Sequence, residues 1–532
     1  MSVDTPEPSG RDLTEHAPSR IERWCGGHRS SGYVSALCLA ILGSWWLAFY
    51  PGISTVDSEQ SWRQAHTWLF QDWHPVFYTW TMAILTRIWN TPAIVTGTQI
   101  LCFVAVLGSL HRRLLRIGVP ALLSFCTPLV IALSPQTGLT VMTLWKDVPF
   151  AIAVLWMFTE VLDVVADPNR YFASWGRCLR LAGSLTAVIL YRHNGKLLVA
   201  GVGLALLVCC RPFWRRLAAS AMVTLVTYGL VTGPMYSYLN VWPSPAMFTY
   251  TVFLHDMAAV VNEHESELPA EDREFLNSIL PINRWKAKTV DNPEGLFFCR
   301  QATPLIFPPE FYPKLRLDRE GRQVPSASLP SVFRQNSESV FLEQHTSEFR
   351  ALWLRSFKRW PGTILRQRRC VASLAWNPGY HAQVQVLRPP FESTVKSPEL
   401  QVRSKSTAMR NFWLEPLRWW DFRSTRFLTW HVATWCYLGF VAVAAIAWRR
   451  RNWRFLLAGA SGFAAWFSVL TFTPGQSSRY MFPAYLCGLA ALPLFALAVR
   501  RNPIAVSASE PLPLAGPATE AVTGTGIVTG TQ

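Results

Sequence analysis

Five short motifs contain the charged residues that could carry chemistry in this sequence. They are Asp57-Ser58-Glu59, Asp72-Trp73-His74-Pro75, Trp145-Lys146-Asp147, Arg192-His193-Asn194-Gly195 and Ser478-Arg479-Tyr480. A carboxylate can accept the proton of an acceptor hydroxyl, and Lys or Arg can stabilise the charge that develops on a phosphate. These residue types therefore suit transfer of a group from a phosphate leaving group to a hydroxyl.

The motifs alternate along the chain with clusters of arginine. The clusters are Arg112-Arg113 with Arg116, Arg177 with Arg180, Arg211 with Arg215-Arg216, Arg449-Arg450-Arg451 and Arg500-Arg501. The positive-inside rule places the clusters in the cytoplasm, which leaves the motifs together at the extracytoplasmic face. Charge at that face has no use in topology, so it indicates a functional site. Because ATP is absent outside the cytoplasm, an activated donor there would be a lipid-linked phosphate.

The first loop offers the candidate catalytic residues Asp57, Asp72 and His74. Each also has a structural interpretation. Asp57 could cap the helix that begins near Ser58, and Asp72 and His74 could orient a helix that Pro75 starts. Which of the two carboxylates would act as a base stays open.

The residues predicted to bind substrate are Glu59, Lys146, Asp147, Arg192, His193, Arg479 and Tyr480. Structural alternatives exist here too, since Lys146 could snorkel to the membrane surface, Asp147 could cap a span and His193 could serve only as a hydrogen-bond partner. Glu59 could be solvated or assist a metal. The 11 cysteines form no CxxC pair and no zinc spacing, so the sequence requires no metal and leaves a divalent cation open.

Apolar residues occur in blocks along the chain. Of its 532 residues, 50% are hydrophobic and 16% are charged. The blocks approach the roughly 20 apolar residues of a membrane span near residues 33–50, 93–110, 118–134, 148–166, 181–195, 196–210, 217–235, 427–448, 455–473 and 480–499. We predict an all-α polytopic membrane protein with about ten transmembrane helices. The net charge of +17 is spread over loops and one long domain, which fits membrane topology and anionic lipid rather than nucleic acid.

The spans also predict how the chain is organised. Two transmembrane modules, 32–235 and 427–500, flank a mainly α or mixed extracytoplasmic domain, 236–426, and residues 1–31 and 501–532 are predicted as disordered cytoplasmic tails. The first loop, 51–92, is aromatic and amphipathic, so we expect helices along the membrane interface. We place the protein in the bacterial plasma (inner) membrane, with both termini in the cytoplasm and the active site outside.

Two features of the predicted extracytoplasmic domain bear on its environment. Cys299 and Cys370 are its only cysteines and could form a disulfide in an oxidising compartment, although the sequence does not give their separation. Between Phe349 and Trp360, apolar residues recur at helical spacing, with basic residues at the other positions. This segment is either an interfacial helix at the membrane or a surface helix packed on the domain core.

The order of the motifs resembles that of the GT-C superfamily of integral-membrane glycosyltransferases. In that superfamily an acidic residue follows span one, an HP motif starts an interfacial helix, and Arg-Tyr with a downstream Pro begins a late span. This chain carries Asp57-Ser58, His74-Pro75, Trp145-Lys146-Asp147, Arg192 to Gly195 and Arg479-Tyr480 with Pro483, and it is similar to poorly characterised bacterial members with DS, HP, W/LKD and RHNG elements. The resemblance extends over most of the chain, from residue 33 to residue 500.

The resemblance implies a polyprenyl-phosphate-linked sugar donor, an inverting displacement and a general base at Asp57. The acceptor would be an envelope glycan, a lipid or a protein. The sequence has no DxD motif, and Trp419-Trp420-Asp421-Phe422 lacks the Tyr-Gly of the WWDYG element of oligosaccharyltransferases. That segment therefore indicates an aromatic belt and argues against peptide-Asn transfer.

Two other classes of function remain as alternatives. One is a transporter or flippase of a lipid-linked saccharide, and the other is a non-catalytic envelope scaffold. A transporter would distribute charges along its spans toward the midplane, whereas the motifs collect at one face. This distribution favours the enzyme.

Overall fold

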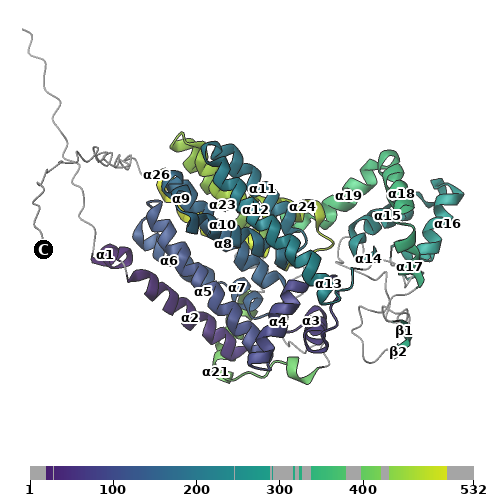
Figure 1. Ribbon diagram of the computed structural model, residues 1–532, viewed down its shortest axis with the longest axis horizontal. Coiled ribbons are helices and arrows are strands. Elements are labelled where there is room, and N and C mark those ends of the chain that lie inside the picture. The colour runs from purple at the N-terminus through teal and green to yellow at the C-terminus, as the bar shows by residue number, and fades with distance from the viewer. Residues whose placement is uncertain are drawn as a thin grey trace, which may run out of the picture.

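The part of the chain that the computed structural model describes is almost entirely helical (Figure 1). The structure describes residues 20–27, 29–244, 246–287, 290–291, 315–317, 323–325, 337–378, 397–420 and 431–499. In this part of the chain, the two strands β1 (Leu315–Leu317) and β2 (Gln323–Pro325) pair antiparallel, with Arg316 opposite Val324. The predicted all-α membrane fold is confirmed.

The first half of the chain is a succession of helices with short turns. They are α1 (Arg20–Gly26), α2 (Ser30–Ala48), α3 (Val56–Thr67), α4 (Val76–Ile88), α5 (Pro92–Arg116), α6 (Ala121–Leu133), α7 (Pro135–Val141), α8 (Asp147–Ala166), α9 (Pro168–Ala173), α10 (Trp175–Tyr191), α11 (Gly195–Cys209), η1 (Arg211–Phe213), α12 (Trp214–Leu230), the π-helix η2 (Val231–Met235) and α13 (Tyr236–Tyr238). The first loop contains α3 and α4.

A second set of helices follows and then returns to the bundle. The outlying helices are α14 (Ala246–Thr249), α15 (Thr251–His264), η3 (Glu265–Glu267), α16 (Ala270–Ile279), η4 (Ile282–Trp285), α17 (Ser337–Gln344), α18 (Thr346–Arg359), α19 (Pro361–Val371) and α20 (Ser373–Trp376). The returning elements are η8 (Pro398–Leu400), α21 (Thr407–Trp420), α23 (Val432–Arg449), η9 (Trp453–Gly459), α24 (Ala460–Phe472), α25 (Ser478–Ala491), η10 (Leu492–Leu494) and α26 (Phe495–Val499).

Seven helices are long and apolar enough to cross a membrane, or up to eight if the bent pair α6 and α7 is one span. The described part of each predicted apolar block lies mostly on one or two helices, but the helices of the blocks near 181–195 and 196–210 are not among these candidate spans. The first, α10, has 17 residues and includes Arg177 and Arg180, and α11 has 15 residues. The chain is a multi-pass membrane protein, and the number of ten spans stays a prediction.

Helix α8 lies deep in the bundle, with 83% of its most apolar stretch buried, and it packs against α5, α10 and α25. Helices α23 and α25 approach each other closely at Gly439 and Gly488. A Cβ atom on Gly439 would lie 2.6 Å from the Cα atom of Gly488, closer than any side chain tolerates. The two backbones therefore touch, and the contact fixes α25 against α23.

Buried ion pairs join α5, α8 and α10 at the ends of these helices away from the five motifs. Arg113 pairs with Glu160 at 2.5 Å and with Asp163 at 2.9 Å. The partly exposed Arg116 pairs with Asp163, and the partly exposed Arg180 pairs with Glu160. Glu160 is fully buried. Arginines that the sequence assigns to topology thus also hold the bundle together.

The outlying helices α14 to α19 group apart from the bundle (Figure 1). They have an apolar core of their own, to which α15, α16, α18 and α19 contribute. Phe349 and Leu352 of α18 are buried in this core, and Trp353, Phe357 and Trp360 pack against it. Of the two interpretations of this segment, the structure supports a helix packed on the domain core.

Several predictions fall partly outside the described residues. The predicted tails do so almost completely, as do Cys299 and the pair Asp421-Phe422. Cys370 lies on α19 and is disulfide-bonded.

Candidate functional site

The five motifs lie at the starts of helices and in tight turns. A capping box begins α3 at Thr55, so Asp57 lies in the first turn and is not the cap. Lys146 directly precedes α8, whose first residue is Asp147. The Arg192 motif forms the turn between α10 and α11, and Arg479 lies in the first turn of α25.

Four of the predicted residues form ion pairs with one another. Asp57 and Arg479, 422 positions apart in the sequence, approach to 2.5 Å between Oδ2 and a terminal guanidinium nitrogen. Asp147 pairs with Arg192, and its second oxygen lies 3.9 Å from Nε of Arg479. All four side chains are largely buried, with at most 23% exposed. The structure thus brings α3, α8, α25 and the α10–α11 turn together.

His74 joins Lys146 to this group. Lys146 Nζ donates to His74 Nδ1 at 2.5 Å, and His74 Nε2 lies 3.8 Å from Asp57 Oδ1. Burial and the neighbouring charge of Lys146 lower the pKa of His74 to about 4. The imidazole is therefore neutral at neutral pH, where it orients Lys146 rather than donating a proton.

Aromatic rings pack on both guanidinium groups. Arg479 lies 4.9 Å from the centre of the Trp145 ring and 5.1 Å from that of Tyr480. Arg192 lies 4.7 Å from the Tyr480 ring. The indole N–H of Trp145 donates to the Thr55 hydroxyl at 2.7 Å, which anchors the ring on α3. Such cation–π contacts hold the guanidinium groups in place and exclude water.

We call Asp57, His74, Lys146, Asp147, Arg192 and Arg479 the ion cluster. With His74 neutral, the cluster has three cations against two carboxylates, so its net charge is positive. Burial would raise the pKa of Asp57, but Arg479 and His74 hold it well below its usual range. Burial lowers the pKa of Lys146 to about 8, although Asp147 and Asp57 favour its charged form. A surplus of desolvated cations is a favourable environment for phosphate.

Polar atoms in and beside the ion cluster lack hydrogen-bond partners within the described part of the chain. They are Nε2 of His74, Oδ2 of Asp147, Nε of Arg479 and the hydroxyl of Ser478. Buried polar groups are almost always hydrogen-bonded, so such atoms need an explanation. An anion with several oxygen atoms would satisfy the unpaired donors.

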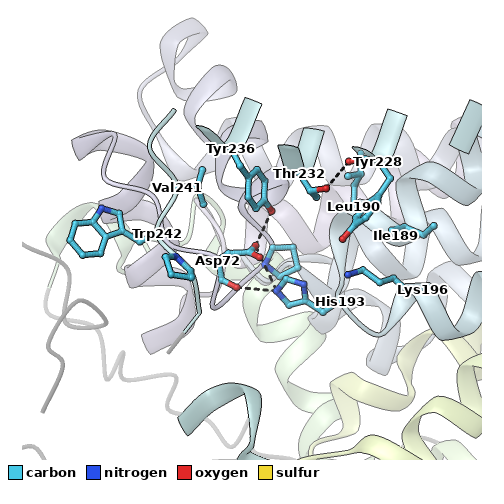
Figure 2. A pocket seen from close by; sticks show the side chains of 12 residues that line it. Asp72, Ile189, Leu190, His193, Lys196, Tyr228, Thr232, Tyr236, Val241 and Trp242 are labelled. Carbon is cyan, nitrogen blue, oxygen red and sulfur yellow. Dashed lines mark hydrogen bonds and ion pairs between the residues drawn. The ribbon is translucent and has the colours of Figure 1, made fainter. Parts of the chain in front are cut away.

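A cavity of about 290 Å³ lies among α10, α11, α12 and η2 (Figure 2). Asp72, His193 and Tyr236 form one polar wall. The Tyr236 hydroxyl donates to Asp72 Oδ1 at 2.8 Å, and His193 Nε2 lies 3.0 Å from the backbone oxygen of Asp72 and 3.7 Å from its carboxylate. Lys196, on the first turn of α11, lies 4.9 Å from the centre of the Tyr228 ring.

The environment of the cavity changes the proton affinity of two of these groups. Burial raises the pKa of Asp72, although His193, the Tyr236 hydroxyl and the Val76 backbone partly oppose it. Burial lowers the pKa of His193, although Asp72 opposes it. A carboxylate with a raised pKa is better matched to accepting a proton near neutral pH.

Two short segments of the chain supply residues to both sites. Asp72 lines the cavity, whereas His74, two positions later, belongs to the ion cluster. Arg192 belongs to the ion cluster, whereas His193 lines the cavity. Arg192 has an extended backbone, with φ −155° and ψ 136°, in which consecutive side chains point to opposite sides. The ion cluster and the cavity therefore adjoin.

Glu59 belongs to neither site. It pairs with Arg63 at 2.5 Å and accepts a hydrogen bond from the Ser397 hydroxyl at 3.0 Å. Across the described ranges, no group of three or more His, Cys, Asp or Glu residues could hold a metal ion. The described residues therefore give no support to the metal role that the sequence left open for Glu59.

Sequence reasoning did not find three residues of the cavity, Lys196, Tyr228 and Tyr236. Lys196 gave a signal, because it is a lysine in the first turn of an otherwise apolar helix. The two tyrosines gave none, since they are two of 14 in the chain and pair with polar groups far away in sequence.

Comparisons with known proteins find a match to one family model and to two solved structures. The model of a family of unknown function, DUF6020, matches residues 62–289, which include the motifs at His74, Lys146 and Arg192. The chain is also similar to crystal structures of ArnT from Cupriavidus metallidurans, one bound to undecaprenyl phosphate and one in the apo state. For each, the identity is 14%, the TM-score is 0.33, and the match covers 88% of this chain and 78% of that chain. No curated protein matches.

Proposed function

We propose that this protein is a membrane glycosyltransferase that moves a sugar from a polyprenyl-phosphate donor to a hydroxyl of an envelope glycan, lipid or protein. The observation that carries the proposal is the ion cluster. It gathers cations from three distant motifs, has a net positive charge, and leaves buried polar atoms unpaired. The donor phosphate would supply the missing anion.

Each member of the ion cluster has a role in this proposal. Lys146, Arg192 and Arg479 bind the phosphate and stabilise the charge that it gains as the glycosidic bond breaks. Asp147 orients the side chains of Arg192 and Arg479, since one of its oxygens pairs with each of them. Asp57 is engaged by Arg479 at 2.5 Å, so it positions that guanidinium and is free to act as a base only when the phosphate draws Arg479 away.

The orientation in the membrane is part of the proposal. We infer that the ion cluster faces the extracytoplasmic side of the bacterial inner membrane and that both termini lie in the cytoplasm, because the arginine clusters lie at the other ends of the spans. The disulfide at Cys370 supports an extracytoplasmic position for α19, since disulfides persist in oxidising compartments.

A transporter of a lipid-linked saccharide is the second candidate. Charges along its path should lie toward the middle of the spans. In the described spans they gather near the ends, as Asp147 and Arg479 do in the first turns of α8 and α25 and Arg113 and Arg116 do in the last turn of α5. This distribution favours the transferase.

Donor turnover tests the proposal. The protein is purified and incubated with a panel of labelled polyprenyl-phosphate sugars and a cell-envelope extract that supplies acceptors, and release of polyprenyl phosphate is measured. At least one donor should be turned over, and Arg192→Ala should weaken its binding by about 2 to 5 kcal/mol, the usual cost of truncating a buried charge pair. Arg449→Ala, an exposed cation at the end of α23, is the control. No turnover of any donor, or full affinity in the alanine variants of Lys146, Arg192 and Arg479, would refute the proposal.

A further inference from the structure

The cavity beside the ion cluster differs from it in charge. Asp72 and Lys196 bring one charge of each sign, and His193 is neutral because burial lowers its pKa. The cavity therefore has no surplus charge, whereas the ion cluster has a positive one. An anionic phosphate is favoured in the ion cluster, and a neutral ligand is favoured in the cavity.

The shape and lining of the cavity narrow the class of that ligand. Its volume of about 290 Å³ lies at the lower end of the range for small-molecule sites. Figure 2 shows the rings of Tyr228 and Tyr236 beside a carboxylate and an ammonium group. Aromatic faces suit the C–H faces of a sugar ring, and Asp72 and Lys196 can bind its hydroxyls as acceptor and donor.

We propose that this cavity receives the acceptor, a neutral sugar or polyol, and that Asp72 takes the proton from the hydroxyl that attacks. This inference rests on the proposed glycosyltransferase function. Donor and acceptor would then meet where residues 72–74 and 192–193 separate the ion cluster from the cavity. This arrangement places a carboxylate beside the attacking hydroxyl and the cations beside the leaving phosphate.

The transfer step balances without another reactant. The acceptor oxygen forms a bond to the anomeric carbon while the bond between that carbon and the phosphate oxygen breaks. The phosphate oxygen keeps the bonding electron pair, and Lys146, Arg192 and Arg479 stabilise the charge. The proton of the acceptor hydroxyl passes to the Asp72 carboxylate, which is oriented by the Tyr236 hydroxyl.

Cavity-filling variants test where the acceptor binds. Binding of a panel of methyl glycosides of neutral hexoses and pentoses is followed by saturation-transfer NMR on the full-length protein, and binding of polyprenyl phosphate is measured in parallel. Thr232→Phe, from η2, should abolish the glycoside signals and leave the affinity for polyprenyl phosphate unchanged. Leu225→Phe adds the same ring on the exposed face of α12 and should change neither. Pro243→Trp fills the cavity from an exposed position and replaces Thr232→Phe if that variant does not fold.

A transfer assay tests the role of Asp72. Asp72→Asn should keep binding to both probes while the rate of transfer falls by about 10² to 10⁴, the usual contribution of a general base. Full transfer in Asp72→Asn would overturn this role. Absence of glycoside binding in the natural protein, or loss of polyprenyl phosphate binding rather than glycoside binding in Thr232→Phe, would overturn the acceptor site. If glycosides bind the cavity and polyprenyl phosphate does not bind at all, the proposed donor falls while the ligand class of the cavity stands.

Discussion

Arg192 and His193 are neighbours in the chain, but their side chains belong to different sites. Arg192 pairs with Asp147 in the ion cluster, and His193 lies 3.7 Å from the carboxylate of Asp72 in the cavity. A single extended residue separates an environment with surplus positive charge from one without surplus charge. The boundary between the two proposed substrates is therefore set by backbone geometry at the turn between α10 and α11.

The affinity for polyprenyl phosphate should fall as the pH rises through about 8, the pKa that burial gives Lys146. Above this pH Lys146 loses its charge, while the phosphate monoester, with a second pKa of about 6, is already a dianion. His74, with a pKa of about 4, is neutral over the whole range, and Arg479 and His74 hold the pKa of Asp57 well below its usual range. Binding isotherms at several pH values check this, and Lys146→Arg should remove the dependence. If Lys146→Arg kept the same pH dependence of binding, a group other than Lys146 would be its cause.

Asp57→Asn should leave the affinity for polyprenyl phosphate intact or increase it. The substitution removes a negative charge from the ion cluster and frees Arg479 from its 2.5 Å pair. Transfer should fall less than in Asp72→Asn, because Asp57 positions a cation in our proposal. Binding and single-turnover rates of both variants check this prediction. If Asp57→Asn lost transfer completely and Asp72→Asn did not, the general base would be Asp57, as the family resemblance implies.

Glu160→Gln should destabilise the bundle. Glu160 is fully buried and pairs with Arg113 at 2.5 Å, so its loss leaves a buried cation partly unpaired. Breaking a buried ion pair in this way costs about 3 to 5 kcal/mol. Thermal unfolding of the purified protein should show a lower transition temperature, and Glu271→Gln on the exposed first turn of α16 is the control. Equal transition temperatures for the two variants would contradict the role of this ion pair.

The predicted orientation can be checked by labelling. A cysteine introduced at Ser278 on α16 should react with an impermeant reagent in cells whose outer barrier has been opened. A cysteine introduced at Arg451, after α23, should react only after lysis. The reverse pattern would place the ion cluster on the cytoplasmic side.

The sequence predicted the helical membrane fold and named every member of the ion cluster. The fold could be predicted because long apolar blocks form helices in a bilayer. The ion cluster could be predicted because charged residues at a membrane boundary that do not serve topology indicate a functional site. The sequence did not predict which carboxylate meets which cation. The pairing of Asp57 with Arg479 depends on how α3 and α25 pack, and no local pattern encodes a contact over 422 positions.

The tyrosines of the cavity and the environment of α18 could not be predicted from the sequence, for related reasons. Tyr236 contacts Asp72 through the packing of α4, α10 and η2, so its role arises only in the folded chain. The basic and aromatic faces of α18 fit a membrane surface and a domain core equally well, and only the burial of Phe349 and Leu352 separates these alternatives. The sequence also does not give the number of spans, because α10 and α11 are short helices.

The contact between Gly439 and Gly488 lies nine positions beyond Arg479, or about 14 Å along α25 at the helical rise of about 1.5 Å per residue. This contact is remote from the ion cluster, yet it limits how far the helix that carries Arg479 can slide or turn. The geometry of the ion cluster is thus determined partly by helix packing deeper in the bundle. Sequence changes or lipids that alter helix spacing there would change the position of Arg479 from a distance.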